Sequence, residues 1–157
     1  MKKLLLLILC CGALSSLALR AGTIAPERVS ASAIKGFLSE KYGCKIDKDG
    51  DLVVNGKNGK IFVEVLPKVK MIRLAGFYKP YDQRTTREMI SLANQFNYQK
   101  RFMRISIGPE EGESVCDYYF LYHGGLNTTA FEEAIDWFES MMGSWETFVV
   151  NGGEKQK

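Results

Sequence analysis

Apolar residues recur at helical spacing in three segments of the chain. The spacing predicts helices over 31–42, 86–98 and 129–143, the last ending at a glycine. Thr85 and Glu88 have the spacing of a capping box, which favours a helix start at this point. The predicted buried stripes are Ile34, Phe37 and Leu38; Met89, Leu92, Ala93 and Phe96; and Phe131, Ile135, Phe138 and Met142.

Short β-branched or alternating segments fill the stretches between these helices. Asp49-Gly50 lies between apolar residues and predicts a tight hairpin turn, because glycine tolerates the positive φ of a type I′ turn. A second turn is expected over 55–59. The strands that follow are predicted at 61–66, 71–78, 103–107 and 115–122, the last two forming a hairpin across a polar loop.

The first of these turns also has an alternative interpretation as a calcium loop. Asp47, Asp49 and Asp51 occupy the first, third and fifth positions of such a loop. However, Leu52 stands where the loop needs glycine, and Asn58 stands where it needs glutamate. The pattern therefore favours a turn, and no metal site is predicted.

The order of elements predicts an α+β fold in which helices pack on one antiparallel sheet. An apolar stripe on each helix needs a surface to cover, and a sheet with one apolar face supplies it. The expected order is α-β-β-β-α-β-β-α. No linker or repeat interrupts residues 30–150, which are predicted to form a single domain followed by a disordered tail at 151–157.

The N-terminus has the three-part pattern of a secretory signal peptide. Lys2 and Lys3 precede an apolar run over 4–14, and the small residues Ser16 and Ala18 suit cleavage after Ala18. An anchor is the alternative, but eleven residues extend about 16 Å as a helix against a bilayer core of about 30 Å. Lipidation at Cys10 or Cys11 is a further alternative, which the position of Cys10 inside the apolar run disfavours.

Cleavage at this point predicts a periplasmic or secreted protein. No other segment approaches 18 apolar residues, so no transmembrane segment is expected in the mature chain. The whole chain has 21 basic and 18 acidic residues, and loss of Lys2 and Lys3 leaves 19 against 18. A balance this close to neutral, in an exported protein, gives no reason to expect a nucleic-acid partner.

Charge is nevertheless unevenly distributed along the chain. Residues 57–104 hold eleven Lys and Arg against three acids, whereas 105–157 hold ten acids and two lysines. The two halves could simply be solvated, or the basic segment could form a face that attracts an acidic partner. The candidate partner-binding residues are Arg73, Lys79, Arg84, Arg87, Lys100, Arg101 and Arg104.

Two cysteines remain after cleavage, Cys44 and Cys116. Disulfides persist in an oxidising compartment, so these residues are a candidate disulfide. The alternative is two unpaired cysteines, one or both buried as small apolar residues.

Catalytic patterns are missing from the sequence. The chain has one histidine, His123, and lacks a nucleophile elbow and the glycine-rich phosphate loops, so we predict neither a catalytic residue nor a cofactor. Five tyrosines could instead form an aromatic contact face on the sheet or pack in the core: Tyr78, Tyr81, Tyr118, Tyr119 and Tyr122.

The C-terminal half resembles the YbjN-type domain, a family of bacterial sensory transduction regulators. The motif residues are Phe96-Asn97, where the family usually has Trp before Asn, then Arg101-Phe102 at a strand start and Gly124-Gly125 before the last helix. The resemblance implies a fold like that of type III secretion chaperones, binding of protein segments, a possible homodimer and no enzymatic activity.

These observations predict an exported, non-enzymatic module that binds a protein or an envelope component, in a chaperone-like or regulatory role. A small-ligand carrier or an enzyme with an unrecognised pocket is the alternative, and it requires an enclosed cavity with convergent polar groups.

Overall fold

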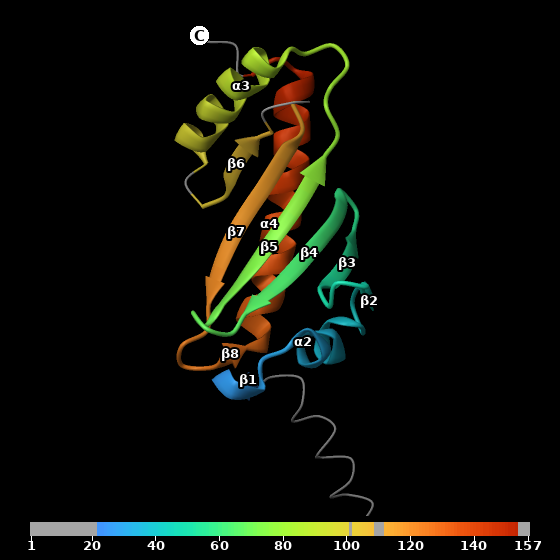
Figure 1. Cartoon of the computed structure of the whole chain (residues 1–157), viewed down its shortest axis with the longest axis vertical. Helices are drawn as coiled ribbons and strands as arrows, with labels where there is room; N and C mark the ends of the chain where they lie inside the picture. The colour runs from blue at the N-terminus through green and yellow to red at the C-terminus, as the bar shows by residue number, and fades with distance from the viewer. Residues whose placement is uncertain (1–21, 101, 109–111, 154–157) are drawn as a thin grey trace, which may run out of the picture.

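The computed structural model describes residues 22–100, 102–108 and 112–153 (Figure 1). The predicted signal peptide, Arg101 and the last four residues of the predicted tail lie outside the described residues. The elements are β1 (Thr23–Ile24), a 3-10 turn (Pro26–Arg28), α2 (Ala31–Leu38), β2 (Gly43–Ile46), β3 (Leu52–Gly56), β4 (Gly59–Leu66), β5 (Met71–Tyr78), α3 (Thr86–Gln99), β6 (Arg104–Ile107), β7 (Ser114–Leu121), β8 (Leu126–Asn127) and α4 (Thr128–Val150).

Six strands form one antiparallel sheet in the order β2-β3-β4-β5-β7-β6. The long helix α4 lies behind β5 and β7 in Figure 1, α2 lies near one end of the molecule, and α3 lies beside β6. The α+β class is confirmed, and the predicted order matches in outline, with four strands instead of three between α2 and α3. The small pair of β1 and β8, which the sequence did not reveal, ties the start of the domain to the start of α4.

The core lies between α4 and one face of the sheet, because alternate residues of each strand point toward the helix. Leu52, Ile61, Leu74 and Cys116 have no exposed surface and lie on successive strands β3, β4, β5 and β7. The helix supplies the opposite side of the core with a stripe that is fully or almost fully buried: Phe131, Ile135, Phe138, Met142, Trp145 and Val149.

Helix α4 is longer than predicted at both ends. It begins at Thr128, with the side chain of Asn127 accepting a hydrogen bond from the Ala130 N–H at 2.9 Å. It does not stop at Gly143, because Trp145 and Val149 continue the buried stripe for two more turns. The packing of these side chains outweighs the cost of one glycine inside the helix, which is about 1 kcal/mol.

Helices α2 and α3 follow the sequence pattern more closely. The Thr85–Glu88 capping box at the start of α3 is confirmed, with the Thr85 N–H donating to Glu88 Oε2 at 2.8 Å. Helix α2 ends at Leu38, four residues earlier than predicted. The chain then turns, and Gly43 becomes the first residue of β2.

The predicted hairpin at Asp49-Gly50 is present, but its loop spans five residues instead of two. Asp47 Oδ1 accepts hydrogen bonds from the N–H groups of Asp49 and Asp51, each at 3.0 Å. Gly50 has a φ of +92° while Asp49 does not have positive φ, so the type I′ turn is not formed. Within the described residues, no group of His, Cys, Asp and Glu side chains is arranged to hold a metal ion.

The candidate disulfide is not formed. Cys44 and Cys116 are both free, on strands β2 and β7. Strands β3, β4 and β5 lie between those two strands, which puts the cysteines about 19 Å apart at the usual strand spacing. A disulfide needs Cα atoms within about 7 Å. Both residues instead point toward the helix side of the sheet, Cys116 fully buried and Cys44 partly so.

Candidate binding face of the sheet

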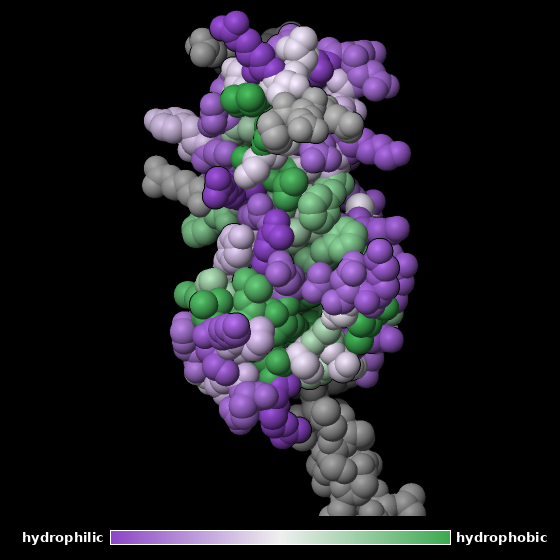
Figure 2. All heavy atoms as spheres, viewed as in Figure 1, coloured by the Kyte–Doolittle hydropathy of each residue, from purple (hydrophilic) through white to green (hydrophobic). Residues whose placement is uncertain are grey.

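One face of the six-stranded sheet is left open by the helices in the described part of the chain. We call it the open face and define it by the residues of β3 to β7 that alternate with the core positions. The side chains of Phe62, Phe77, Tyr119 and Leu121 lie on it. Figure 2, which looks onto this side, shows hydrophobic side chains over its middle and lower parts with hydrophilic ones between them.

Apolar side chains on the open face are substantially exposed. Phe77 is 55% exposed, Tyr119 49% and Leu121 61%. The ring of Phe77 packs edge-on against Phe62, with centroids 5.3 Å apart, so the two aromatic residues form one cluster on the open face. Exposed apolar residues gathered on one surface, and not scattered singly, are typical of an interaction site.

A charged cluster crosses the middle of the open face. Arg73 Nε donates to Asp117 Oδ1 at 2.6 Å, and Arg73 Nη1 lies 3.4 Å from Glu64 Oε2. The strand register places Glu64 and Tyr119 on either side of Arg73, with Asp117 diagonal to it. The hydrogen bond to Asp117 raises the pKa of the Arg73 guanidinium, against the opposing effect of burial. The cluster holds one cation between two carboxylates, so this part of the face is polar.

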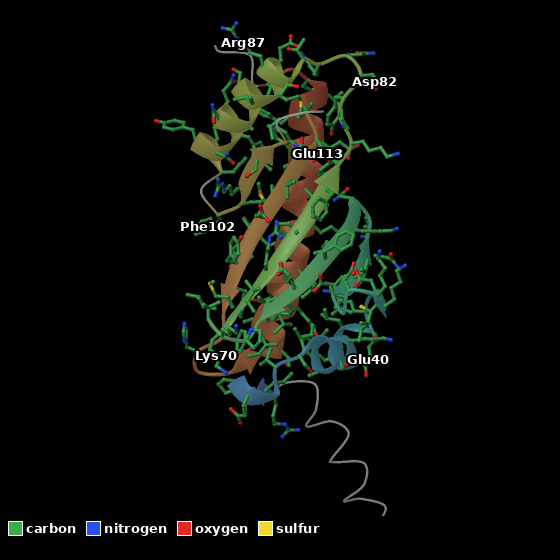
Figure 3. All side chains as sticks on the ribbon, in the orientation of Figure 1. Glu40, Lys70, Asp82, Arg87, Phe102 and Glu113 are labelled. Atoms are coloured by element: carbon green, nitrogen blue, oxygen red, sulfur yellow. The ribbon has the colours of Figure 1, made fainter. Side chains whose placement is uncertain are left out.

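The predicted basic residues do not form one surface. Arg73 and Arg104 lie on the open face, and Lys79 follows the end of β5. Arg84 donates to the Val149 carbonyl at the C-terminal end of α4, where a cation is favoured by the helix dipole. Figure 3 shows Arg87 at one end of the molecule and Lys70 at the other, so the basic segment 57–104 is spread along its length.

Three of the motif residues have clear structural roles. Phe96 is buried and packs edge-on against Trp145, with ring centroids 5.3 Å apart. Asn97 donates from Nδ2 to the Ile105 carbonyl at 2.9 Å and accepts the Ile105 N–H on Oδ1 at 2.7 Å. Gly125 has a φ of +107°, and a Cβ there would lie 2.5 Å from Thr23 Cγ2.

The other motif residues differ from these. Phe102 is 75% exposed, and its ring meets that of Trp137 at 6.0 Å between centroids. A Cβ on Gly124 would meet nothing within 4 Å, so no contact explains glycine there. Lys100, one of the predicted basic residues, follows α3 as an exposed residue. Its neighbour Arg101 is a motif and candidate-binding residue that falls outside the described part.

The tyrosines divide between the two alternatives that the sequence left open. Tyr119 is exposed on the open face, whereas Tyr122 is 1% exposed. Tyr78, Tyr81 and Tyr118 are partly buried against the core. Tyr78 donates its hydroxyl to the Met142 carbonyl at 2.9 Å, and burial raises its pKa far above the ordinary value.

An open groove of about 550 Å³ lies between the C-terminal parts of α3 and α4. Its lining includes Phe96, Lys100 and Ser144, but neither His123 nor Asp117. Ser144 and Thr147 donate their hydroxyls to carbonyls one turn earlier in their own helix, at 3.0 and 2.9 Å. The groove is therefore not the enclosed cavity with convergent polar groups that an enzyme or a small-ligand carrier would need.

The comparisons with known proteins agree with this geometry. A family profile described as YbjN, a putative bacterial sensory transduction regulator, matches residues 32–149. The chain belongs to the YbjN family. This match covers most of the domain and shows that the resemblance drawn from the motif residues was correct. No curated protein matches the sequence.

Two solved structures share the fold of this YbjN-family chain. The crystal structure of YbjN, a putative transcription regulator from E. coli, aligns with a TM-score of 0.63 at 8% identity, covering 78% of this chain and 93% of that one. The structure of the HopA1-SchA chaperone-effector complex aligns with a TM-score of 0.52 at 12% identity, covering 71% and 86%. The predicted likeness to secretion chaperones is thereby confirmed for the fold. These proteins, a regulator and a chaperone, are of non-enzymatic kinds.

Sequence reasoning missed how the open face is built. Arg73 was selected as one of many basic residues, and nothing indicated that it pairs with Asp117, which is 44 positions away. Strand alternation was the signal that could have placed Glu64 in this cluster. Glu64 falls between the buried Val63 and the partly buried Val65, so its side chain points to the opposite face of the sheet. The partner of Asn97 could not have been found this way, since it is a backbone group. No helix in the described residues is long and apolar enough to cross a membrane.

Proposed function

We propose that this chain is an exported, non-enzymatic module that binds a polypeptide on the open face of its sheet. The observation that carries the proposal is the set of exposed apolar side chains on that face, Phe77, Tyr119 and Leu121, which no described helix covers. An antiparallel sheet with one face on the core leaves its other face free for a partner. Exposed aromatic residues are enriched where proteins bind one another.

The charged cluster supports a protein partner over a nucleic acid. Arg73 is already paired with Asp117 and Glu64, so the centre of the face presents two carboxylates with its cation. A phosphate backbone would be repelled by those carboxylates, because nucleic-acid affinity depends on unpaired Lys and Arg. A polypeptide can place apolar side chains on either side of the cluster and acidic groups near Arg104, which lies opposite Asp117 in the register of β6 and β7.

The fold relatives support the same conclusion. HopA1-SchA is described as a chaperone-effector complex, and E. coli YbjN as a putative transcription regulator. A regulatory or chaperone-like protein acts by holding another molecule. The absence of a catalytic pattern in the sequence fits that role. Asp117, the one buried charged residue among those that the structure describes, forms an ion pair with Arg73.

The proposed export is tested by the leader itself. Residues 1–25 fused to alkaline phosphatase, which is active only outside the cytosol, should give active enzyme. The mature full-length protein should begin at Leu19 by mass spectrometry. A fusion without activity, or an intact leader on the purified chain, would refute export without touching the binding proposal.

The binding proposal is tested with a permanently unfolded probe. A reduced and carboxymethylated protein is titrated with the chain that begins at Leu19, using fluorescence anisotropy. Phe77→Asp and Tyr119→Asp should each weaken binding by about tenfold or more, since each places a charge in an apolar contact. Tyr98→Asp is the matched control, because Tyr98 is 88% exposed on α3, away from the open face.

Equal affinities for the three variants and the parent protein would show that the open face is not the binding surface. Light scattering on the same samples gives the oligomeric state and tests the expected homodimer. Circular dichroism of each variant establishes that a loss of binding is not a loss of folding.

A further inference from the structure

The large sheet has three stretches of strand edge, and two of them are closed to further pairing. The edge of β6 is covered at Ile105 by Asn97, whose amide pairs with both backbone groups of that residue in the way a neighbouring strand would. The edge strand β2 is only four residues long, carries Lys45 within it and is followed by Lys48. Short edge strands with lysine are a common protection against unwanted pairing.

The third stretch has no such protection from the residues that the structure describes. Strand β6 pairs with β7 only from Ser114 to Asp117, so β7 continues for residues 118–121 with no described strand on that side. Figure 1 shows β7 extending well beyond β6 along an open margin. We call residues 118–121 on this side the free edge of β7.

The strand register shows which backbone groups point out of this edge. The Tyr122 N–H donates to the Lys70 carbonyl at 3.0 Å, so these two opposite residues form a hydrogen-bonded pair. Hydrogen-bonded and non-bonded pairs alternate along an antiparallel ladder. Tyr119 opposite Arg73, and Leu121 opposite Met71, are therefore non-bonded pairs. Their N–H and C=O groups point away from β5, toward the free edge.

The side chains around the free edge are apolar on both faces of the sheet. Tyr119 and Leu121 project onto the open face, where both are about half exposed or more. On the other face, Trp137 packs against Tyr118 and against the exposed ring of Phe102, with centroids 5.5 and 6.0 Å apart. Figure 3 shows Phe102 at the margin of β7, next to the start of β6.

The sequence of this stretch makes an uncovered edge unfavourable. Residues 118–122 read Tyr-Tyr-Phe-Leu-Tyr, with no charge, proline or glycine. A segment of high β-propensity without charge, exposed at a strand edge, is an aggregation site unless another strand covers it. The other two edges of the same sheet are protected. The free edge of β7 is therefore the stretch at which we expect a further strand to bind.

We propose that the free edge of β7 binds an extended segment of a partner polypeptide, which adds to the sheet as a further strand. This inference rests on the proposed function and states how the partner is held. The added strand would exchange four hydrogen bonds with Tyr119 and Leu121. Its side chains would be apolar on both faces, one set meeting Tyr119 and Leu121 and the other meeting Phe102 and Trp137.

The available area favours a peptide strand over a second copy of this chain. Phe102, Tyr119 and Leu121 together expose on the order of 400 Å² of side chain, taking roughly 200 Å² for each. A stable dimer buries about 800 Å² on each partner. Strand addition needs less, because its main-chain hydrogen bonds supply much of the affinity and the flanking side chains supply selectivity.

The test uses a synthetic peptide with the sequence of residues 59–66, Gly-Lys-Ile-Phe-Val-Glu-Val-Leu, which is apolar on one face of a strand and carries Phe and Leu beside Lys and Glu on the other. Two control peptides carry N-methyl groups on alternate residues, at the third, fifth and seventh positions in one and at the fourth, sixth and eighth in the other. In an added edge strand only one alternate set of N–H groups meets β7. One control peptide should therefore lose binding by about tenfold or more, while the other binds like the parent.

Amide hydrogen exchange by NMR locates the binding site. In the free protein the amides of Tyr119 and Leu121 should exchange faster than those of Tyr118 and Phe120, which are bonded to β5. Saturating parent peptide should slow both by about tenfold or more. If the two N-methylated peptides behave alike, strand addition is wrong. Slowed exchange at Cys44 and Ile46 instead would show that the strand adds to β2.

A pair of protein variants provides a second measurement. Leu121→Pro removes an N–H that the fold does not use and should abolish peptide binding. Ile46→Pro makes the same change at the edge of β2, where the register also turns the N–H outward, and should leave binding unchanged. If Leu121→Pro unfolds the protein, the N-methyl comparison still decides, because it needs no variant.

The outcomes separate this inference from the proposed function. A parent peptide that fails to bind, while the unfolded probe protein still binds through Phe77, overturns strand addition and leaves the open-face proposal standing. Failure of both probes overturns the two together.

Discussion

Asn97 lies at the edge of the sheet and serves as the neighbour that β6 otherwise lacks. Its side-chain amide donates to the Ile105 carbonyl and accepts the Ile105 N–H, at 2.9 and 2.7 Å. Asn97→Ala removes both hydrogen-bond partners. The N–H and C=O of Ile105, a residue that is only 3% exposed, are then left unpaired. Each orphaned buried group costs about 1–3 kcal/mol. Since the edge admits some water, we expect a loss of about 2–3 kcal/mol in the free energy of unfolding.

In Asn97→Asp, pH decides whether one or both of these hydrogen bonds can form. A carboxylate still accepts the Ile105 N–H, but its second oxygen then faces the Ile105 carbonyl and repels it. A protonated carboxyl can donate there, so the folded-state pKa of the new Asp should rise above its unfolded value of about 3.9. The variant should thus approach the parent in stability below pH 4 and lose stability as pH rises through the raised pKa.

Urea unfolding of the parent, Asn97→Ala and Asn97→Asp at pH 3.5 and pH 7 measures both effects. A loss of about 2–3 kcal/mol corresponds to a fall in Tm of roughly 10 °C for a domain of this size. Exchange of the Ile105 amide should accelerate in the alanine variant. A loss below about 0.5 kcal/mol in Asn97→Ala, or a pH-independent difference between Asn97→Asp and the parent, would show that Asn97 does not close the edge of β6.

Three further predictions follow from individual contacts. Gly125→Ala should destabilise the fold by about 1–3 kcal/mol in urea unfolding, because φ is positive there and a Cβ would meet β1, while Gly124→Ala should be nearly neutral; equal effects would contradict this reasoning. Burial acts to raise the pKa of Asp136, but hydrogen bonds from Lys41 and Tyr42 outweigh it, so the pKa is lowered. Acidification from pH 6 to pH 3 should therefore cost the parent protein more stability than it costs Asp136→Asn. Identical pH profiles for the two proteins would refute the ion pair. Burial raises the pKa of Cys116 to about 12, so iodoacetamide at pH 8 should modify Cys44 before Cys116 in the native protein. Mass spectrometry of tryptic peptides measures the order of modification, and the reverse order would contradict this prediction.

Much of the fold could be predicted from the sequence, since local signals agreed with the final packing. The Thr85–Glu88 capping box and the stripe from Met89 to Phe96 predicted α3 to within one residue at its end. The strands from 61 to 78 were also predicted closely, because alternating apolar residues indicate a strand with one buried face. The motif residues led to the correct family.

The failures arose where long-range packing competed with a local signal. Gly143 is a common helix terminator, but Trp145 and Val149 bury fully against the core and carry α4 onward. The Cys44–Cys116 disulfide was a candidate from compartment and number alone, and the alternative of two unpaired cysteines is the one found. Only the strand order shows that three strands separate the two thiols.

The sequence by itself determined most of the buried helix stripes, where most elements lie and to which family the protein belongs, because periodicity and capping are properties of neighbouring residues. The tertiary structure alone decided the surface that we propose for binding. It brought Arg73 to Asp117, placed Asn97 against β6 and left the free edge of β7 uncovered. Those relations depend on strand order and register, which join residues that are distant along the chain and leave no local trace in it.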